Sequence, residues 1–306
     1  MGEFHRNLAK AELHVHLEGS VEPETFLELH PELSRQEVLE HYSFEDFRGF
    51  IRAYTWVALR LKTPQDYALI TRRLLERLAA ENVRYVEINL SVGVMLYLDL
   101  DPAPLFDAAE REAAASPVRV RWIFDAVRQF GPEKAQAVAE LAAARVPRGV
   151  VGFGIGGDES RGPAEWFGEV FAFARRSGLH LAPHAGETVG PESVWAALEM
   201  GAERIGHGIR AIDDPALVRH LRDHGIPLEI SISSNLATGA VGALDDHPVR
   251  KLFEAGVPLT LNTDDPAMFR TTLSREYEIA EDAFGFSHAE LEELAGNGFR
   301  FAFGLE

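Results

Sequence analysis

The chain has 306 residues, 46% of them hydrophobic, which is enough to bury a sizeable core in one or two domains. Its 48 acidic residues outnumber 30 Lys and Arg residues, and the formal net charge of −18 repels nucleic acid backbones. The lack of cysteine excludes disulfides and thiolate metal sites. No apolar run approaches the roughly 18 residues of a membrane span, and no signal peptide is visible. We therefore expect a cytoplasmic protein that binds neither nucleic acid nor membranes.

Eight apolar, β-branched runs recur along the chain and predict eight strands. In chain order they cover residues 11–17, 83–91, 118–126, 149–157, 179–186, 204–208, 226–234 and 257–265. Segments with apolar residues at every third or fourth position separate most of these runs, and such a period predicts amphipathic helices. Gly178, Gly225 and Gly256 each precede a strand, at a place where glycine commonly ends a helix.

This alternation is typical of a (β/α)8 TIM barrel, and we expect residues 1–306 to form a single domain of that kind. A doubly wound parallel sheet is the alternative, because pattern alone separates the two folds poorly. Residues 20–82 depart from the alternation of one strand and one helix, since several helical segments there precede the second strand. An insertion after the first strand would lie at the C-terminal face of the barrel. Its helix over residues 47–62 fits a substrate lid and a helix packed on the barrel equally well.

Titratable residues end four of the predicted strands: His14 and His16, His184 and Glu187, His207, and Asp264 and Asp265. In a barrel these ends meet at one mouth. His14 and His16 point the same way because a strand alternates its faces. Three imidazoles and a carboxylate suit Zn²⁺ with an open position for water. We therefore predict one zinc ion per chain, held by His14, His16, His184 and one of the two aspartates, Asp264 or Asp265.

Seven motifs carry a resemblance that covers nearly the whole chain. In order they read HVHLEGS, GGDE, HAGE, IGHG, SSNLATGAV, HPV and LNTDDP. This ordered set resembles the adenosine deaminase family of metal-dependent hydrolases. The resemblance implies a zinc-containing (β/α)8 barrel that replaces the 6-amino group of a purine by oxygen and releases ammonia.

The resemblance also implies roles for single residues. It makes His14, His16, His184 and Asp264 the zinc ligands. It assigns the remaining roles as follows: Glu187 protonates purine N1, His207 lies beside the attacking water, Asp265 hydrogen-bonds N7, the backbone N–H of Gly157 donates to N3, and Glu18 contacts the sugar side. Glu187, His207 and Asp265 would be the catalytic residues. The reaction needs such an acid whether or not the resemblance holds. Negative charge builds on the ring during the attack, and a carboxyl that keeps its proton in an apolar pocket can neutralise this charge.

The identity of the purine is a finer question. The segments TWVALRLKTPQDY, NVRYVEINLSVGVML and RWIFDAVRQFG resemble bacterial aminodeoxyfutalosine deaminases of menaquinone biosynthesis. Such a substrate carries a carboxyphenyl ketone on its sugar, which calls for an apolar slot and a cation. The helix over 47–62 offers four cations for this role: Arg48, Arg52, Arg60 and Lys62. We therefore expect aminodeoxyfutalosine as the substrate and adenosine as the alternative, with adenine less favoured.

Two further alternatives come from other classes of protein. A metal-dependent amide or ester hydrolase would not need Glu187 and Asp265, which together match a purine edge. A metal-free purine-binding protein would not need all four ligands. Asp125 ends the third predicted strand and either serves the fold or binds substrate. Eight histidines outside the motif ends are expected at the surface or at helix ends: His5, His30, His41, His180, His220, His224, His247 and His288.

Overall fold

The computed structural model describes residues 2–305, and its strands form two parallel sheets. The first sheet has the order β1-β2-β3-β4-β5 and the second the order β6-β7-β8-β9. The strands are β1 Lys10–His16, β2 Val83–Leu90, β3 Arg119–Val127, β4 Val150–Gly156, β5 His180–Leu181, β6 His184–Ala185, β7 Ile205–His207, β8 Leu228–Ile230 and β9 Leu259–Leu261.

The two sheets close into one barrel. β5 pairs with β4 and β6 pairs with β7, and Pro183, which has no N–H to donate, separates the two short strands. At the other edge Val15 and Asp264 form a parallel bridge, and the His16 N–H donates to the Asp264 carbonyl at 2.8 Å. Because β5 and β6 continue one another, the nine segments of residues 2–305 make eight barrel strands. The predicted (β/α)8 barrel is confirmed, and the doubly wound alternative is wrong.

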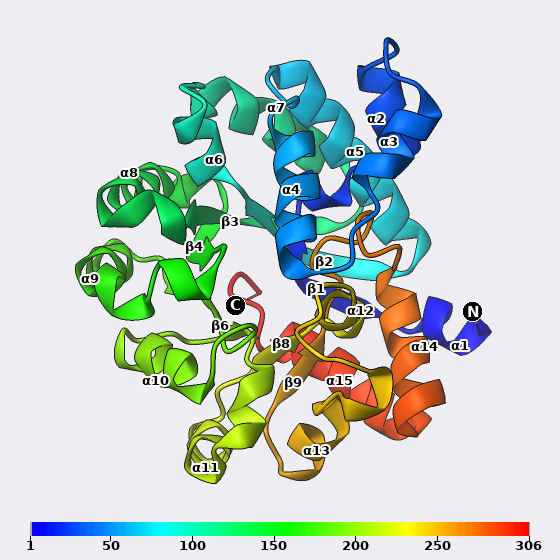
Figure 1. The fold of residues 1–306 in the computed structure, drawn as a ribbon, viewed down its shortest axis with the longest axis vertical. Helices are drawn as coiled ribbons and strands as arrows, with labels where there is room; N and C mark the ends of the chain where they lie inside the picture. The colour runs from blue at the N-terminus through cyan, green and yellow to red at the C-terminus, as the bar shows by residue number, and fades with distance from the viewer. Residues whose placement is uncertain (1, 306) are drawn as a thin grey trace.

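Helices surround the strands as a ring, which Figure 1 shows from the mouth. The helices that follow the barrel strands are α5 Pro64–Ala80, α7 Pro102–Ala115, α8 Gly131–Ala143, α9 Gly168–Arg176, α10 Pro191–Glu199, α11 Pro215–His224, α13 Val249–Glu254 and α15 His288–Arg300. Four more are α1 Glu3–Asn7, α6 Val92–Tyr97, α12 Ile232–Ala237 and α14 Leu273–Phe284. Capping boxes at Thr63 and Ser287 start α5 and α15. Within residues 2–305 no helix is both long and apolar enough to cross a bilayer.

The insertion expected over residues 20–82 contains α2 Pro23–Leu29, α3 Arg35–His41 and α4 Phe47–Ala58, followed by α5. α5 packs on α7 and β2 and so serves as the first helix of the ring. α4 lies beside the barrel mouth in Figure 1. Asp46 caps α4 by accepting from the Gly49 N–H at 2.6 Å, and Phe50 of α4 packs on Phe269 with ring centroids 4.9 Å apart.

Three predicted strands were too long, since the run 257–265 contains only β9 and the run 179–186 is divided into β5 and β6, and the third is the run that contains β8. The run 226–234 alternates apolar and polar residues, but β8 ends at Ile230, whose carbonyl accepts from the Asn262 N–H at 2.8 Å. Past this point the chain turns into α12, so that the Ser234 hydroxyl can donate to Asp264 Oδ2 at 2.7 Å. Alternation over four residues cannot distinguish a strand end from a short helix.

The segment 301–305, which we call the tail, lies at the centre of the helix ring in Figure 1. Its Phe301 carbonyl accepts from the Arg204 guanidinium at 2.8 Å, and its Phe303 N–H donates to Glu87 Oε1 at 2.6 Å. The Phe303 ring centroid lies 3.6 Å from the guanidinium carbon of Arg204, which is a cation–π distance. The tail therefore closes one end of the barrel by polar and stacking contacts.

Candidate active site

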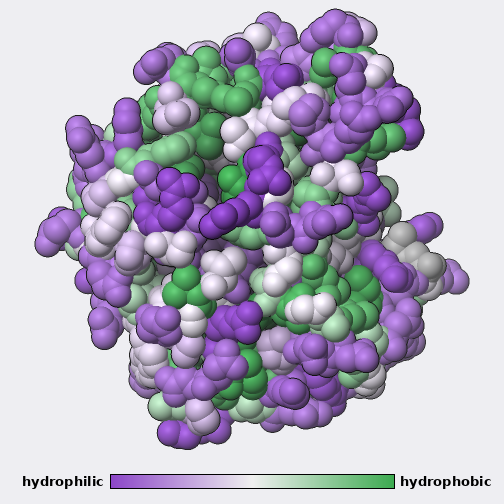
Figure 2. Space-filling model, viewed as in Figure 1, coloured by the Kyte–Doolittle hydropathy of each residue, from purple (hydrophilic) through white to green (hydrophobic). Residues whose placement is uncertain are grey.

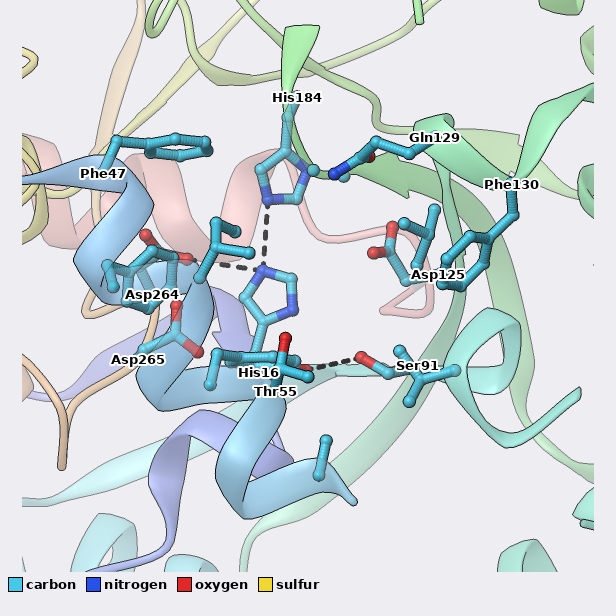
Figure 3. A pocket seen from close by; sticks show the side chains of 18 of the residues that line it. His16, Phe47, Thr55, Ser91, Asp125, Gln129, Phe130, His184, Asp264 and Asp265 are labelled. Atoms are coloured by element: carbon cyan, nitrogen blue, oxygen red, sulfur yellow. Dashed lines mark hydrogen bonds and ion pairs between the residues drawn. The ribbon is translucent and has the colours of Figure 1, made fainter. Parts of the chain in front are cut away.

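A cavity of about 490 Å³ opens at the C-terminal ends of the strands. Its polar wall consists of His16, Ser91, Asp125, Gln129, Arg161, His184, Glu187, His207, Asp264 and Asp265. Apolar side chains of α4, α6 and the segment after β3 form the rest of the wall. Figure 3 shows the His16 and His184 rings between Asp264 and Asp265 on one side of the view and Asp125 on the other. The mouth of the barrel thus brings together most of the residues predicted for the site.

The four predicted metal ligands meet at one point. One ligand atom from each of His14, His16, His184 and Asp264 lies within 4.8 Å of the others, and all four residues are buried. His16 Nε2 is 3.1 Å from His184 Nε2, and Asp264 Oδ1 is 3.3 Å from Nε2 of both His14 and His16. Burial lowers the pKa of His16 to about 4, so its imidazole stays neutral with a free lone pair. This donor set fits a metal ion of the zinc type.

A chain of buried charges stands behind His14. His14 Nδ1 lies 2.8 Å from Glu229 Oε2, so an N–H there donates to the carboxylate and leaves Nε2 for the cluster. Glu229 Oε1 accepts from Arg204 Nε at 2.5 Å, and Arg204 Nη2 donates to Glu87 Oε2 at 2.5 Å. Each of these four residues is at most 1% exposed. A carboxylate that holds the second nitrogen of a ligand histidine fixes its tautomer and its orientation. No motif or spacing indicates the contact between His14 and Glu229, which are 215 residues apart.

Asp264 is held in an unusual backbone conformation. Its φ of 63° lies in the left-handed region, which a non-glycine residue adopts only when its surroundings hold it there. The bridge to Val15 and the hydroxyl of Ser234, which donates to Oδ2 at 2.7 Å, supply that support. Burial opposes its charge, but the close imidazole of His14, whose Nε2 is 3.3 Å from Oδ1, and the other surrounding imidazoles keep the pKa of Asp264 well below its usual value. Asp264 therefore offers an ionised carboxylate to the cluster.

A hydrogen-bond chain fixes the tautomer of His207. The Val249 N–H donates to His247 Nδ1 at 3.2 Å, so His247 Nε2 carries the proton and donates to Asn235 Oδ1 at 3.1 Å. The Asn235 amide then donates to His207 Nδ1 at 3.1 Å. The proton of neutral His207 consequently sits on Nε2, which is 3.8 Å from Glu187 Oε2. His207 thus presents a hydrogen-bond donor to the cavity.

Two of the eight histidines expected at the surface are buried. His247, which belongs to this hydrogen-bond chain, is 3% exposed. His5 is 4% exposed and lies 2.7 Å from a carboxylate oxygen of Glu281. Both lie at helix ends, which the prediction allows, since His5 is in the last turn of α1 and His247 directly follows a short helix over 244–246. Their burial was not foreseen, because their partners come from segments that sequence spacing does not connect. The HPV motif, which contains His247, was the one available signal.

Glu159 positions the loop that carries Glu187. Its carboxylate accepts from the N–H groups of Gly186, Glu187 and Thr188 at 2.8 to 2.9 Å and from the Ser193 hydroxyl at 2.5 Å. Glu187 itself is 5% exposed. Burial, with the charges of nearby carboxylates, raises the pKa of Glu187 well above its usual value. Its surroundings therefore favour the protonated form of Glu187, which faces the cavity.

Asp265 is a second buried carboxyl whose surroundings favour the protonated form. It is 2% exposed, and burial together with the neighbouring charge of Asp264 raises its pKa well above the usual value. Its Oδ1 has no hydrogen-bond partner in residues 2–305. Gly157, on the opposite side of the barrel mouth, has a φ of 96° that strains any other residue, and an added Cβ would collide with the Gln129 side chain. Asp265 and Gly157 both line the cavity.

Glu18 does not reach the cavity wall. Its carboxylate accepts from the hydroxyls of Tyr54 at 3.3 Å and Tyr67 at 3.4 Å and from the Ser91 N–H at 3.3 Å. Burial raises its pKa to about 7. Tyr54 and Ser91 line the cavity in its place, and their hydroxyl oxygens are 2.6 Å apart. The predicted contact of Glu18 with a sugar would therefore act through these two hydroxyls.

The cations predicted over residues 47–62 do not line the cavity either. Arg48, Arg52 and Lys62 lie on exposed positions, and the guanidinium of Arg60 stacks on Trp56 at 4.2 Å. Among residues 2–305 the lysine or arginine side chain that does line the cavity is Arg161, in the short helix η4 Glu159–Arg161 after β4. No hydrogen bond or ion pair engages its guanidinium within the described chain. A cation thus stands at the mouth, on a different loop from the predicted one.

Known proteins resemble this chain over its whole length. The model of the family described as "Adenosine deaminase" matches residues 9–305. An aminodeoxyfutalosine deaminase of Streptomyces coelicolor is 40% identical over 314 residues, which cover 98% of this chain and 81% of that protein.

Solved structures share the fold and the arrangement of elements. An adenine deaminase from Arthrobacter aurescens superposes with a TM-score of 0.90 at 29% identity, covering 96% of this chain and 94% of that one. An amidohydrolase from Burkholderia ambifaria with bound Zn superposes with a TM-score of 0.91 at 27% identity, covering 98% of this chain and 87% of that one. With the matched family model and the buried cluster of three histidines and an aspartate, these likenesses show that the chain belongs to the adenosine deaminase family.

Proposed function

We propose that this barrel is a zinc-dependent hydrolytic deaminase, which converts the 6-amino group of a purine nucleoside to a 6-oxo group. The observation that carries this proposal is the juxtaposition of a buried His₃Asp cluster with two carboxyls whose pKa values are raised, Glu187 and Asp265. The proposed substrate is aminodeoxyfutalosine and the proposed location is the cytoplasm. Adenosine is the second candidate, because a cavity that holds the larger aminodeoxyfutalosine also has room for this smaller nucleoside.

The cluster suits zinc in particular. The ion would be held by His14, His16, His184 and Asp264. His14 Nε2 is a buried nitrogen that has no hydrogen-bond partner in residues 2–305, and the ion would provide a partner for it. When bound, zinc supplies a Lewis acid that lowers the pKa of a water from 15.7 towards about 7 and so provides a nucleophile at neutral pH.

The two protonated carboxyls recognise opposite edges of the purine. N1 and N7 both accept hydrogen bonds, so a partner must donate, and an ionised carboxylate cannot. Glu187 and Asp265 keep their protons because they are buried, and they can donate to N1 and N7 respectively. The backbone N–H of Gly157 is the proposed donor to N3. Three donors in these positions specify a purine orientation with C6 towards the histidine cluster.

Proton movements follow from these protonation states. As the water oxygen bonds to C6, Glu187 gives its proton to N1 and neutralises the charge that builds on the ring. His207 presents Nε2–H, so it holds the oxygen by donating a hydrogen bond instead of taking a proton. The ionised Asp264 beside it is the acceptor available for the water proton, which then passes to the departing 6-amino group. Loss of ammonia, with the remaining proton of the new C6–OH group passing to the Glu187 carboxylate, leaves the 6-oxo purine with its proton on N1 and restores the acid.

Replacing Glu229 by glutamine is expected to weaken zinc binding about 10- to 100-fold, because a partner of a ligand histidine holds its ring in place. Competition with a chromophoric chelator measures that affinity. Glu203→Gln, which removes an exposed carboxylate near His180, is the matched control and is expected to change nothing. Unchanged zinc affinity in Glu229→Gln would show that the barrel alone positions His14.

The shape of the cavity supports aminodeoxyfutalosine as the substrate. Leu59 and Tyr97 at its rim are 39% and 60% exposed, and Tyr97 stacks on Phe130 with centroids 4.5 Å apart. In Figure 2 hydrophobic side chains gather over α6 beside this rim. Arg161 provides a cation without a partner in the described chain. An aryl group could lie on the aromatic rim while its carboxylate reaches Arg161.

The test compares kcat/KM for aminodeoxyfutalosine, adenosine, 5′-methylthioadenosine and adenine. Arg161→Gln is expected to lower kcat/KM for aminodeoxyfutalosine about 10- to 100-fold, which corresponds to the loss of one hydrogen bond to a charged group. It is expected to change kcat/KM for adenosine less than about 3-fold. Arg48→Gln, an arginine of α4 outside the cavity wall, is the control. A preference for adenosine in the parent enzyme would reject the substrate, and no turnover of any of the four would reject the deaminase.

A further inference from the structure

A fourth buried carboxyl faces the cavity, and the mechanism above does not use it. Asp125 of β3 is 4% exposed, and it lines the cavity wall. No hydrogen bond or ion pair engages its carboxyl within residues 2–305, and its Oδ1 is a buried atom without a partner. Burial raises its pKa to about 8. A buried polar group without a partner costs stability, so such a group is commonly kept for a ligand.

The neighbouring cation does not serve as that partner. Arg128 is 1% exposed, and its guanidinium donates to the carbonyl oxygens of Gly162 at 2.9 Å and of His184. Its charge acts on Asp125 from beyond ion-pair distance. Arg128 therefore ties the loops together, and the Asp125 carboxyl remains available.

Strand β4 makes room for this carboxyl. A Cβ on Gly154 would lie 2.7 Å from Asp125 Oδ1, and a Cβ on Gly156 would lie 3.0 Å from Oδ2. Asp125 and Gly154 are paired residues on adjacent strands. Two glycines in alternate positions thus leave a recess where the carboxyl lies flat against β4 and faces the cavity.

The purine orientation places the sugar on this side of the barrel. Glu187 and Asp265, the proposed partners of N1 and N7, follow β6 and β9 of the second sheet. N9 lies across the ring system from C6, so its substituent points towards the first sheet. Asp125 of β3 and Gly157 after β4 belong to that half of the mouth. In Figure 3 Asp125 lies on the far side of the imidazole rings from Asp264 and Asp265.

We propose that Asp125 hydrogen-bonds the 2′- or 3′-hydroxyl of the ribose and so makes the enzyme select nucleosides over free purine bases. This inference rests on the proposed function, because it takes the purine orientation from it. Acidic side chains bind ribose hydroxyls in the same way in dinucleotide-binding folds. Either protonation state serves, since a carboxylate accepts from a hydroxyl and a carboxyl can both accept and donate.

The experiment measures inhibition constants of adenosine, 2′-deoxyadenosine and 3′-deoxyadenosine against deamination of aminodeoxyfutalosine. The parent enzyme is expected to bind adenosine at least about 10-fold more tightly than one of the two deoxynucleosides. In Asp125→Ala that ratio is expected to fall below about 3, with kcat/KM for aminodeoxyfutalosine lowered roughly 10- to 100-fold. Asp125→Asn keeps hydrogen-bonding atoms. Its ratio and its kcat/KM are therefore expected to lie between those of the parent enzyme and those of Asp125→Ala.

Thermal unfolding separates a ligand contact from a structural role. Because Asp125 has no partner in the described chain, both variants are expected to keep or raise the Tm. A Tm lowered by several degrees, or equal losses for adenosine and both deoxynucleosides, would overturn the inference. Equal binding of all three nucleosides by the parent enzyme would overturn it as well. If the parent enzyme deaminates no purine, the proposed function fails, while direct calorimetry of the three nucleosides still tests Asp125.

Discussion

Replacing Glu187 by glutamine is expected to lower kcat/KM for deamination by about 10³-fold or more, at the upper part of the range for general acid catalysis. Glutamine fills the same space and still donates a hydrogen bond, but it has no proton to give to N1. Because the pKa of Glu187 is raised, the substitution removes a proton donor and does not remove a negative charge. Steady-state kinetics that follow the ultraviolet change from 6-amino to 6-oxo purine measure the effect.

The matched control for this prediction is Glu192→Gln, an exposed carboxylate at the start of α10 and close in sequence. It is expected to retain full activity. Zinc content and Tm should stay unchanged in Glu187→Gln, because Glu187 is not part of the ligand cluster. A loss below about 10-fold would move the acid role to another group. A loss of zinc would instead make Glu187 a ligand.

Removing the metal is expected to bring turnover below about 1% of its starting rate, since without it no group of the site can make water a nucleophile at neutral pH. Adding back Zn²⁺ should restore the rate and saturate at one ion per chain. Mg²⁺ should not restore it, because that ion prefers an octahedron of oxygen ligands and this cluster offers three imidazoles. Activity and metal content, titrated together after chelation, measure the effect.

Substitution tests the same centre from the side of the protein. Asp264→Asn keeps the shape of the side chain but removes the negative charge that the neighbouring imidazoles stabilise. The variant is expected to lose both zinc binding and activity. Asp158→Asn, after β4 and outside the cavity wall, is the control. Full activity of the metal-stripped enzyme, or a saturation at two ions per chain, would contradict a single zinc site.

The strands and the ligand positions were predictable from the sequence because they depend on short-range signals, whereas the choice of a barrel over a doubly wound sheet and of Asp264 over Asp265 rested on the family resemblance. Each strand is a compact apolar run, and each ligand stands at the end of such a run. The barrel topology then brings His14, His184 and Asp264 together without further information. The helices after the strands were predictable for the same reason, since their period of three to four residues is local.

The remaining parts of the site depend on contacts between distant segments. Glu229 stands in a strand three residues long, and nothing in its neighbourhood indicates that it meets His14. Arg161 was missed because its loop turns back over the mouth, a path that no pattern records. Glu18 was expected at the sugar, but Tyr54 from the inserted helix covers it. Such packing follows from tertiary structure, which composition and periodicity do not encode.

The tail has a consequence for the order of events during protein synthesis. It contacts Arg204 and Glu87, which belong with Glu229 to the chain of charges behind the ligand His14. His14 and His16 leave the ribosome early, whereas Asp264 and the tail emerge near the end. A barrel whose first strand pairs with its last has high contact order and cannot close until both are available. The ligand cluster therefore cannot assemble until the segment that carries Asp264 has been synthesised, long after His14 and His16.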